Sequence, residues 1–289
     1  MPRTSRLLIA PIAVLGFIGA SCASDDGGSA ATIPKTAVAS PSTSSIANAA
    51  TTTAGTEPPT TVPAVAGDVV VFAASSLTEA FTEMGDAFKA KNPDAHVTFN
   101  FAGSGDLVTQ ITQGAPADVF VSADDANMTK LTDAGENAGE PVSIAKNTFE
   151  IIVEKGNPKA IKGVADLANP DLIVVLCADT VPCGKGAAKV LQNAGVTVTP
   201  KSFEDKVKGV VTKVTAGEAD AGIVFVTDVN AAGADAQGVE IPADVNVISN
   251  YPIVVTKAAP NAPAAQAFVD FVASDAGQAI LAKYGFLAP

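Results

Sequence analysis

Short apolar runs that alternate with amphipathic segments constrain the fold of this chain more than any other feature. The run Val69–Ala73 is continuous and apolar, which is typical of a strand buried in a parallel sheet. In the following segment, Leu77–Lys91, apolar residues recur at three- and four-residue steps and predict a helix. The same reasoning predicts strands at 96–101 and 117–122 and helices at 106–113 and 124–134. Strands that alternate with helices predict a doubly wound α/β sheet.

The alternation returns in the second half of the chain. Strands are predicted over 149–153, 172–177, 221–226 and 245–256, and helices over 185–194, 204–216, 262–273 and 275–284. The phrase 114–122 is also echoed by the phrase 217–225, since each combines a helix end, a turn and a buried strand. We interpret this repetition as two similar α/β lobes.

The N-terminal part has a different composition. Two arginines precede the apolar run 7–20, and small residues then lead to Cys22, the order of an export signal. This segment resembles a bacterial lipobox, so we predict a lipoprotein signal peptide over 1–21 with lipid attachment at Cys22. An ordinary secretory signal with an incidental cysteine is the alternative. Residues 22–67 are rich in Ser, Thr, Ala and Pro, cannot bury enough apolar surface to offset their ordering entropy, and are predicted to form a disordered tether.

Two further cysteines, Cys177 and Cys183, remain if Cys22 carries the lipid. An even pair in an oxidising compartment favours a disulfide, and two buried free thiols are the alternative. Their spacing matches no zinc motif and the chain has a single histidine, so no metal site is predicted.

The charge of the chain limits its partners. Thirty acidic residues stand against 18 basic ones, which gives a formal net charge of −12. Such a surface argues against nucleic acid, which needs basic patches. An anion site in this chain would have to work through local dipoles, because the overall field repels anions.

Two places combine the end of a predicted strand, a serine and the start of a predicted helix. They are Ser75-Ser76 and Ser104, which lies between Gly103 and Gly105. A helix N-terminus offers unpaired N–H groups and the positive end of its dipole, and a serine adds an O–H donor. Open α/β sheets bind ligands at such strand ends. The pattern therefore predicts an anion site without formal charge, with two ordinary helix caps as the alternative.

Several phrases, in order, resemble the periplasmic molybdate-binding protein family. They are Val70–Phe81, Phe101–Leu107, Gln110–Asp124, Val181–Gly184, Gly222–Phe225 and Lys283–Phe286. The resemblance covers about residues 68–289 and implies the type II periplasmic-binding-protein fold, in which two hinged α/β lobes close on an anion. It implies a first lobe formed by 68–147 and 248–289 and a second lobe formed by 148–247.

The resemblance also implies a set of ligand contacts. The family's hydroxyl donors fall on Ser76 and Ser104, its backbone N–H donors on Cys183 and Val207, and its tyrosine donor on Phe225. Two positions depart from the family, which usually has a small residue such as alanine at Cys183 and a hydroxyl at Phe225. A phenyl ring donates no hydrogen bond, and losing one to a charged ligand costs about 1.5–3 kcal/mol unless another donor replaces it.

Two side chains bear on this replacement and on selectivity. Thr227 or a water molecule is the candidate replacement donor. Asp106 would accept the proton of hydrogen phosphate if it pointed into the site, but we expect it to point outward as a first-turn carboxylate. Neutral donors then suit a fully deprotonated dianion. Cavity size would discriminate against sulfate, and the absence of an acceptor would discriminate against hydrogen phosphate.

We therefore expect an extracytoplasmic, lipid-anchored solute-binding protein that captures molybdate or tungstate for the permease subunits of an ABC importer. The chain is expected to be monomeric, to have no cofactor or enzymatic activity, and to meet the membrane only through its lipid. One alternative is a binding protein for sulfate, phosphate or another oxyanion, and a second is an adhesion protein on a stalk. The third is a secreted serine hydrolase that uses Ser76 or Ser104 with His96, although no Gly-x-Ser-x-Gly elbow is present.

Overall fold

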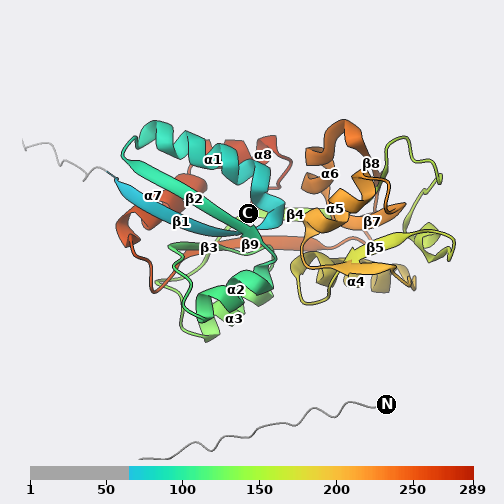
Figure 1. The fold of residues 1–289 in the computed structure, drawn as a ribbon, viewed down its shortest axis with the longest axis horizontal. Helices are drawn as coiled ribbons and strands as arrows, with labels where there is room; N and C mark the ends of the chain where they lie inside the picture. Colours follow the sequence, from blue (N-terminus) through green and yellow to red (C-terminus); the bar gives the residue numbers. More distant parts are fainter. Residues whose placement is uncertain (1–64) are drawn as a thin grey trace, which may run out of the picture. The chain divides into compact units, whose positions relative to one another are not determined.

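The computed structural model describes residues 65–289. The predicted signal peptide, Cys22 and nearly all of the predicted tether lie outside the described residues. The described chain forms nine strands with the order β2-β1-β3-β9-β4-β7-β5-β6, and β8 pairs with β4 (Figure 1). Within residues 65–289, no helix combines the length and apolar character that a membrane crossing requires.

The first group of strands forms lobe 1. Its strands are β1 (Gly67–Ala74), β2 (Ala95–Ala102), β3 (Val119–Val121) and β9 (Ile248–Val255). The first three are parallel to one another, and β9 is antiparallel to β3. The carboxyl ends of β1 and β2 therefore lie side by side, with Ala74 opposite Ala102. This pairing brings the two serine-bearing turns that follow these strands to the same edge.

Helices cover both faces of this sheet (Figure 1). One face carries α1 (Thr78–Lys91), α7 (Ala262–Ala273) and α8 (Asp275–Lys283), which contact each other. The other face carries α2 (Ser104–Thr112) and α3 (Asp125–Asp133). The two faces bury separate apolar clusters. The cluster on the side of α2 and α3 includes Leu107 and Phe120. A short 3-10 turn, η1 (Ser75–Leu77), joins β1 to α1.

The second group of elements forms lobe 2. Its strands are β5 (Val174–Cys177), β6 (Ser202–Glu204), β7 (Ala221–Phe225) and β8 (Ala236–Glu240). Its α-helices are α4 (Pro182–Ala194) on one face and α5 (Val207–Thr215) with α6 (Val226–Ala232) on the other (Figure 1). Two 3-10 turns, η2 (Val164–Ala168) and η3 (Gly233–Asp235), complete it. Strands β5, β6 and β7 are parallel, as in lobe 1.

One long strand, β4 (Val142–Glu154), belongs to both lobes. Residues 142–148 pair with β9, and residues 149–154 pair with β7 and β8. The chain therefore passes into lobe 2 along β4 and returns between β8 and β9. The boundaries inferred from the sequence, near 147/148 and 247/248, stay a prediction.

The structure differs from the predicted elements in several ways, among them that β4 begins at Val142 and not at Phe149. The sheet is mixed, because β4 and β9, which connect the lobes, run antiparallel to their neighbours. The short elements β6, β8 and α6 were not predicted, since three to seven residues give too little periodicity. The helix predicted over 204–216 begins instead at Val207, because β6 continues to Glu204.

Candidate anion-binding site

A small cavity lies between the two lobes. Its lining comes from the turns that follow β1, β2, β3 and β5 and from the starts of α5 and α6. The lining residues are Ala74, Ser75, Ser76, Ala102, Gly103, Ser104, Ala123, Val181, Pro182, Cys183, Lys206, Val207 and Phe225. All five ligand contacts inferred from the sequence are therefore brought together in one place. Their role in binding a ligand stays a prediction.

Helix starts converge on this cavity. Four helices begin among its lining residues, namely α2 at Ser104, α4 at Pro182, α5 at Val207 and α6 directly after Phe225. Within residues 65–289 none of these four has a side-chain cap, whereas α3 and α8 are capped by Asp124 and Ser274. The N-terminal ends of four helices, with their unpaired N–H groups and positive dipole ends, thus lie around one cavity, which suits an anion.

The hydroxyl of Ser104 has a hydrogen-bond partner within lobe 1. The backbone N–H of Ala123 donates a hydrogen bond to Ser104 Oγ at 3.1 Å. Ser104 is only 1% exposed, so its own proton has little access to bulk water. With its oxygen accepting from the protein, the hydroxyl can direct its proton into the cavity.

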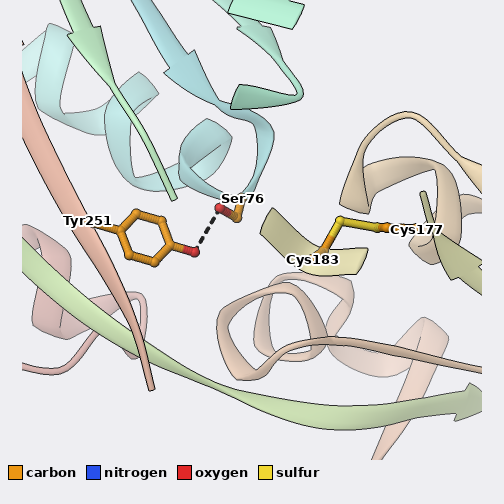
Figure 2. The surroundings of a disulfide bond; sticks show 4 residues. All are labelled: Ser76, Cys177, Cys183 and Tyr251. Carbon is orange, nitrogen blue, oxygen red and sulfur yellow. Dashed lines mark hydrogen bonds between the residues drawn. A yellow bond between two sulfur atoms is a disulfide. The ribbon is translucent and has the colours of Figure 1, made fainter. Parts of the chain in front are cut away.

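The hydroxyl of Ser76 has a different partner. Its Oγ lies 2.9 Å from the hydroxyl of Tyr251, a fully buried residue of β9 (Figure 2). Sequence reasoning missed this tyrosine, because a residue inside a predicted strand gives no local sign of what it faces 175 positions away. It also missed Lys206, which lines the cavity as the residue before α5 and has only its adjacency to Val207 as a signal.

Cys177 and Cys183 are joined in a disulfide, the first of the two alternatives for this pair (Figure 2). The bond links the end of β5 to the first turn of α4. Because the thiol is used in the bond, the backbone N–H of Cys183 is the donor it can offer. The adjacent turn is tightly packed, since a Cβ atom at Gly184 would lie 1.9 Å from the carbonyl oxygen of Ala178.

Phe225 offers no donor and is packed among aromatic rings. It is 1% exposed, and its ring centroid lies 4.6 Å from that of Phe149 and 5.8 Å from that of Tyr251. Thr227, the candidate replacement donor, accepts a hydrogen bond from Asn147 at 2.8 Å and does not line the cavity. Asp106 is exposed on the first turn of α2 and does not line the cavity, although its Oδ2 would lie 3.3 Å from a Cβ atom at Gly103, so its outward orientation stays a prediction.

Two ion pairs join the lobes beside the cavity. Lys208 of α5 contacts Glu79 of α1 at 2.8 Å, and Lys185 of α4 contacts Asp124 at 2.8 Å. Lys208 also lies 3.1 Å from Asp228, which is completely buried in lobe 2. Burial raises the pKa of Asp228 to about 6, although the Lys208 ammonium acts in the opposite direction.

The hydrolase alternative lacks its base at this site. His96 is exposed near the amino end of β2, opposite Asp68 of β1, whereas the serines follow the carboxyl ends of β1 and β2. Among residues 65–289, no group of three or more His, Cys, Asp or Glu side chains is placed to hold a metal ion.

Residues 69–287 match the family described as bacterial extracellular solute-binding protein. The chain belongs to this family of solute-binding proteins. A relative, the molybdate-binding protein ModA of Mycobacterium tuberculosis, is 44% identical over 224 residues, which cover 78% of this chain and 86% of that protein. The resemblance to molybdate-binding proteins inferred from the sequence is thereby confirmed, and because these relatives bind solutes, the expectation of a protein that is not an enzyme is confirmed as well.

Solved structures share the fold. The periplasmic molybdate-binding protein of Azotobacter vinelandii has a TM-score of 0.66 and 22% identity, with 76% of this chain and 99% of that chain covered. The sulfate-binding protein SubI of Mycobacterium tuberculosis has a TM-score of 0.65 and 20% identity, with 76% and 86% covered. These neighbours confirm the predicted α/β periplasmic-binding-protein fold, and at such identities they show the fold alone.

Proposed function

We propose that this protein captures molybdate or tungstate outside the cytoplasm and delivers it to the permease subunits of an ABC importer. The observation that carries the proposal is the convergence of four uncapped helix starts and two buried serine hydroxyls on one small cavity. The 44% identical molybdate-binding relative supports the choice of ligand.

The chemistry of the lining fits a dianion that carries no proton. Such an anion only accepts hydrogen bonds, and the cavity offers O–H and N–H donors at Ser76, Ser104, Cys183 and Val207. These four donors are neutral and need no desolvated counter-charge, although the cation Lys206 also lies among the lining residues. Asp106, a candidate acceptor for a ligand proton, is exposed and does not line the cavity. These features favour molybdate or tungstate over hydrogen phosphate.

Isothermal titration of the purified protein with molybdate, tungstate, sulfate and phosphate at neutral pH tests the proposal. Strong heats with molybdate and tungstate and none with the other two anions are expected. Tight binding of sulfate or phosphate instead would keep the importer role but change the cargo. The absence of a binding heat with all four anions would overturn the proposal.

The double variant Ser76→Ala with Ser104→Ala tests the site. Each lost hydrogen bond to a charged ligand is worth about 1.5–3 kcal/mol, so the affinity for molybdate should fall by roughly two orders of magnitude or more. Ser143→Ala, at an exposed serine of β4, is the matched control. Unchanged melting temperatures of the unliganded variants would exclude unfolding as the cause. An unaltered affinity in the double variant would show that the ligand binds elsewhere.

Attachment to the outer face of the membrane through a lipid on Cys22, with residues 22–67 as a tether, is part of the same proposal. It rests on the sequence, since Cys22 lies outside the described residues. Cys22→Ser should release the protein from membranes into the medium, and retention of the variant in the membrane fraction would contradict it. We also propose a monomer, which size-exclusion chromatography with light scattering would test.

A further inference from the structure

Buried polar side chains form a connected chain behind the cavity. Asn147 Nδ2 donates to Thr227 Oγ1 at 2.8 Å and lies 3.4 Å from the hydroxyl oxygen of Tyr251. That hydroxyl in turn lies 2.9 Å from Ser76 Oγ (Figure 2). All four residues are at most 5% exposed. They come from α6, β4, β9 and η1, so this chain of hydrogen bonds begins in lobe 2 and ends at the cavity in lobe 1.

The direction of these hydrogen bonds is fixed at one end. The side-chain oxygen of Asn147 accepts from the backbone N–H of Thr148 at 3.0 Å, so its amide nitrogen faces Thr227 and Tyr251. An amide NH₂ group donates and does not accept. The hydroxyl oxygen of Tyr251 therefore accepts from Asn147, which leaves its single proton free for Ser76 Oγ, although the distance to Ser76 is compatible with either hydroxyl as the donor.

The Tyr251 proton is firmly held. Burial raises the pKa of this phenol well above its ordinary value, so the group remains a donor throughout the neutral range. In the arrangement in which Tyr251 donates, Ser76 Oγ is the acceptor and its own proton is free for the cavity that it lines. Ser104 is held in the same way by the N–H of Ala123.

We propose that Asn147 and Tyr251 are positioning residues that direct the Ser76 proton at the ligand, and so make the cavity favour oxyanions that carry no proton. This inference rests on the proposed function. A free serine hydroxyl can donate or accept and would adapt to either kind of anion. A serine that already accepts from Tyr251 has its proton committed to the ligand and only one lone pair left, which suits molybdate better than the protonated oxygen of hydrogen phosphate. Chained donors also strengthen one another.

The packing of Phe225 against Tyr251 shows how this chain of hydrogen bonds can act on the ligand. The position where the molybdate-binding family has a tyrosine carries no hydroxyl here, and the nearest phenol is Tyr251, one layer behind Ser76. Tyr251 thus acts on the ligand through Ser76 and not by direct contact, since it does not line the cavity.

Tyr251→Phe tests the proposed chain of hydrogen bonds, because it keeps the ring and removes only the hydroxyl. Tyr284→Phe is a matched control, because Tyr284 is the other tyrosine of the chain and its hydroxyl bonds Glu83 away from the cavity. The full protein is titrated with molybdate and with inorganic phosphate at neutral pH. In Tyr251→Phe the molybdate affinity should fall about tenfold, and the ratio of molybdate to phosphate affinity should shrink by more than that. Tyr284→Phe should match the wild type in both.

The ratio of molybdate to phosphate affinity separates a positioning role from general damage to the site, which would lower the affinity for both anions alike. In a Ser76→Ala background, Tyr251→Phe should cause no further change of the ratio, because the effect passes through Ser76. If Tyr251→Phe does not fold, Asn147→Asp carries the test. Its added charge disfavours both anions, but it reverses the hydrogen bonds, so the ratio should again shrink.

The outcomes distinguish this inference from the function on which it rests. Wild-type protein that binds molybdate together with a Tyr251→Phe variant of unchanged ratio would overturn the donor chain alone. A further loss of selectivity in the Ser76→Ala background would overturn it as well. Wild-type protein that binds none of the four oxyanions would overturn the proposed function, and the donor chain with it.

Discussion

Gly103 in lobe 1 lies against the backbone of Asp205 in lobe 2, so closely that a Cβ atom at Gly103 would be 2.5 Å from the Asp205 carbonyl oxygen. The same atom would lie 2.9 Å from a methyl group of Val181. Any side chain at this position must push the lobes apart at the rim of the cavity. The hydrogen of glycine is therefore a condition for full closure.

Gly103→Ala should accordingly weaken molybdate binding by about tenfold or more, with little change in the stability of the unliganded protein. The reason is that closure, and not folding of either lobe, is obstructed. Titration calorimetry and thermal melts measure the two quantities. Gly163→Ala is the control, because its Cβ would meet nothing within 4 Å. Equal affinities for the two variants would contradict the tight contact.

Glu79→Gln should loosen the closed form through the loss of the ion pair with Lys208. Since both side chains are partly exposed, a cost of about 0.2–1 kcal/mol is expected, which corresponds to a loss of affinity of up to about fivefold at low salt. At about 0.5 M salt the difference from wild type should shrink. Glu204→Gln, whose partner Lys213 lies within lobe 2, should leave affinity unchanged. A difference in affinity that does not change with salt would indicate that Glu79 acts other than through the ion pair.

Phe225→Tyr should tighten molybdate binding by about tenfold, because Phe225 lines the cavity and a phenol would add one donor to a charged ligand. Its ring is already surrounded by Phe149 and Tyr251, which should hold the new phenol in a fixed orientation. Calorimetry measures the gain, and Phe203→Tyr, at an exposed position of β6, is the control. A weaker affinity in Phe225→Tyr would mean that the hydroxyl fills space the ligand needs.

Asp228→Asn should change how stability depends on pH. Burial raises the pKa of Asp228 from its ordinary 3.8 to about 6, so the folded protein holds this proton more tightly than the unfolded chain. The contribution of Asp228 to stability is therefore fully present below about pH 4 and is lost as the pH rises through about 6.

The free energy of unfolding of the wild type relative to Asp228→Asn should thus fall by about 2–3 kcal/mol between about pH 4 and pH 7. Urea unfolding at several pH values measures this difference. Asp133→Asn controls for the removal of an exposed carboxylate. A difference that is constant with pH would show that Asp228 does not titrate in this range.

The parts of the site that could be predicted from the sequence are those with a local signature. Ser76 and Ser104 stand between a buried strand and a helix, and parallel strands must bring such turns to one edge. The contribution of lobe 2 came from resemblance to a family, because nothing local to Cys183 or Val207 indicates that they face lobe 1.

The remainder depends on pairing over long distances. Tyr251 reaches Ser76 only because β9 lies between β3 and β4, and the period of a strand does not specify its neighbours. Asn147 is similar, since its contact with Thr227 requires both lobes to be in place. The sequence also did not indicate that β4 is one strand shared by the lobes.

The aromatic packing around Tyr251 has a spectroscopic consequence. The chain has no tryptophan and only two tyrosines. In Tyr284→Phe, all tyrosine fluorescence of the protein therefore arises from Tyr251, whose hydroxyl bonds a cavity serine and whose ring forms a T-shaped pair with Phe225. That variant would carry an intrinsic optical probe at the cavity, so ligand binding and lobe closure could be followed in time without attaching a dye.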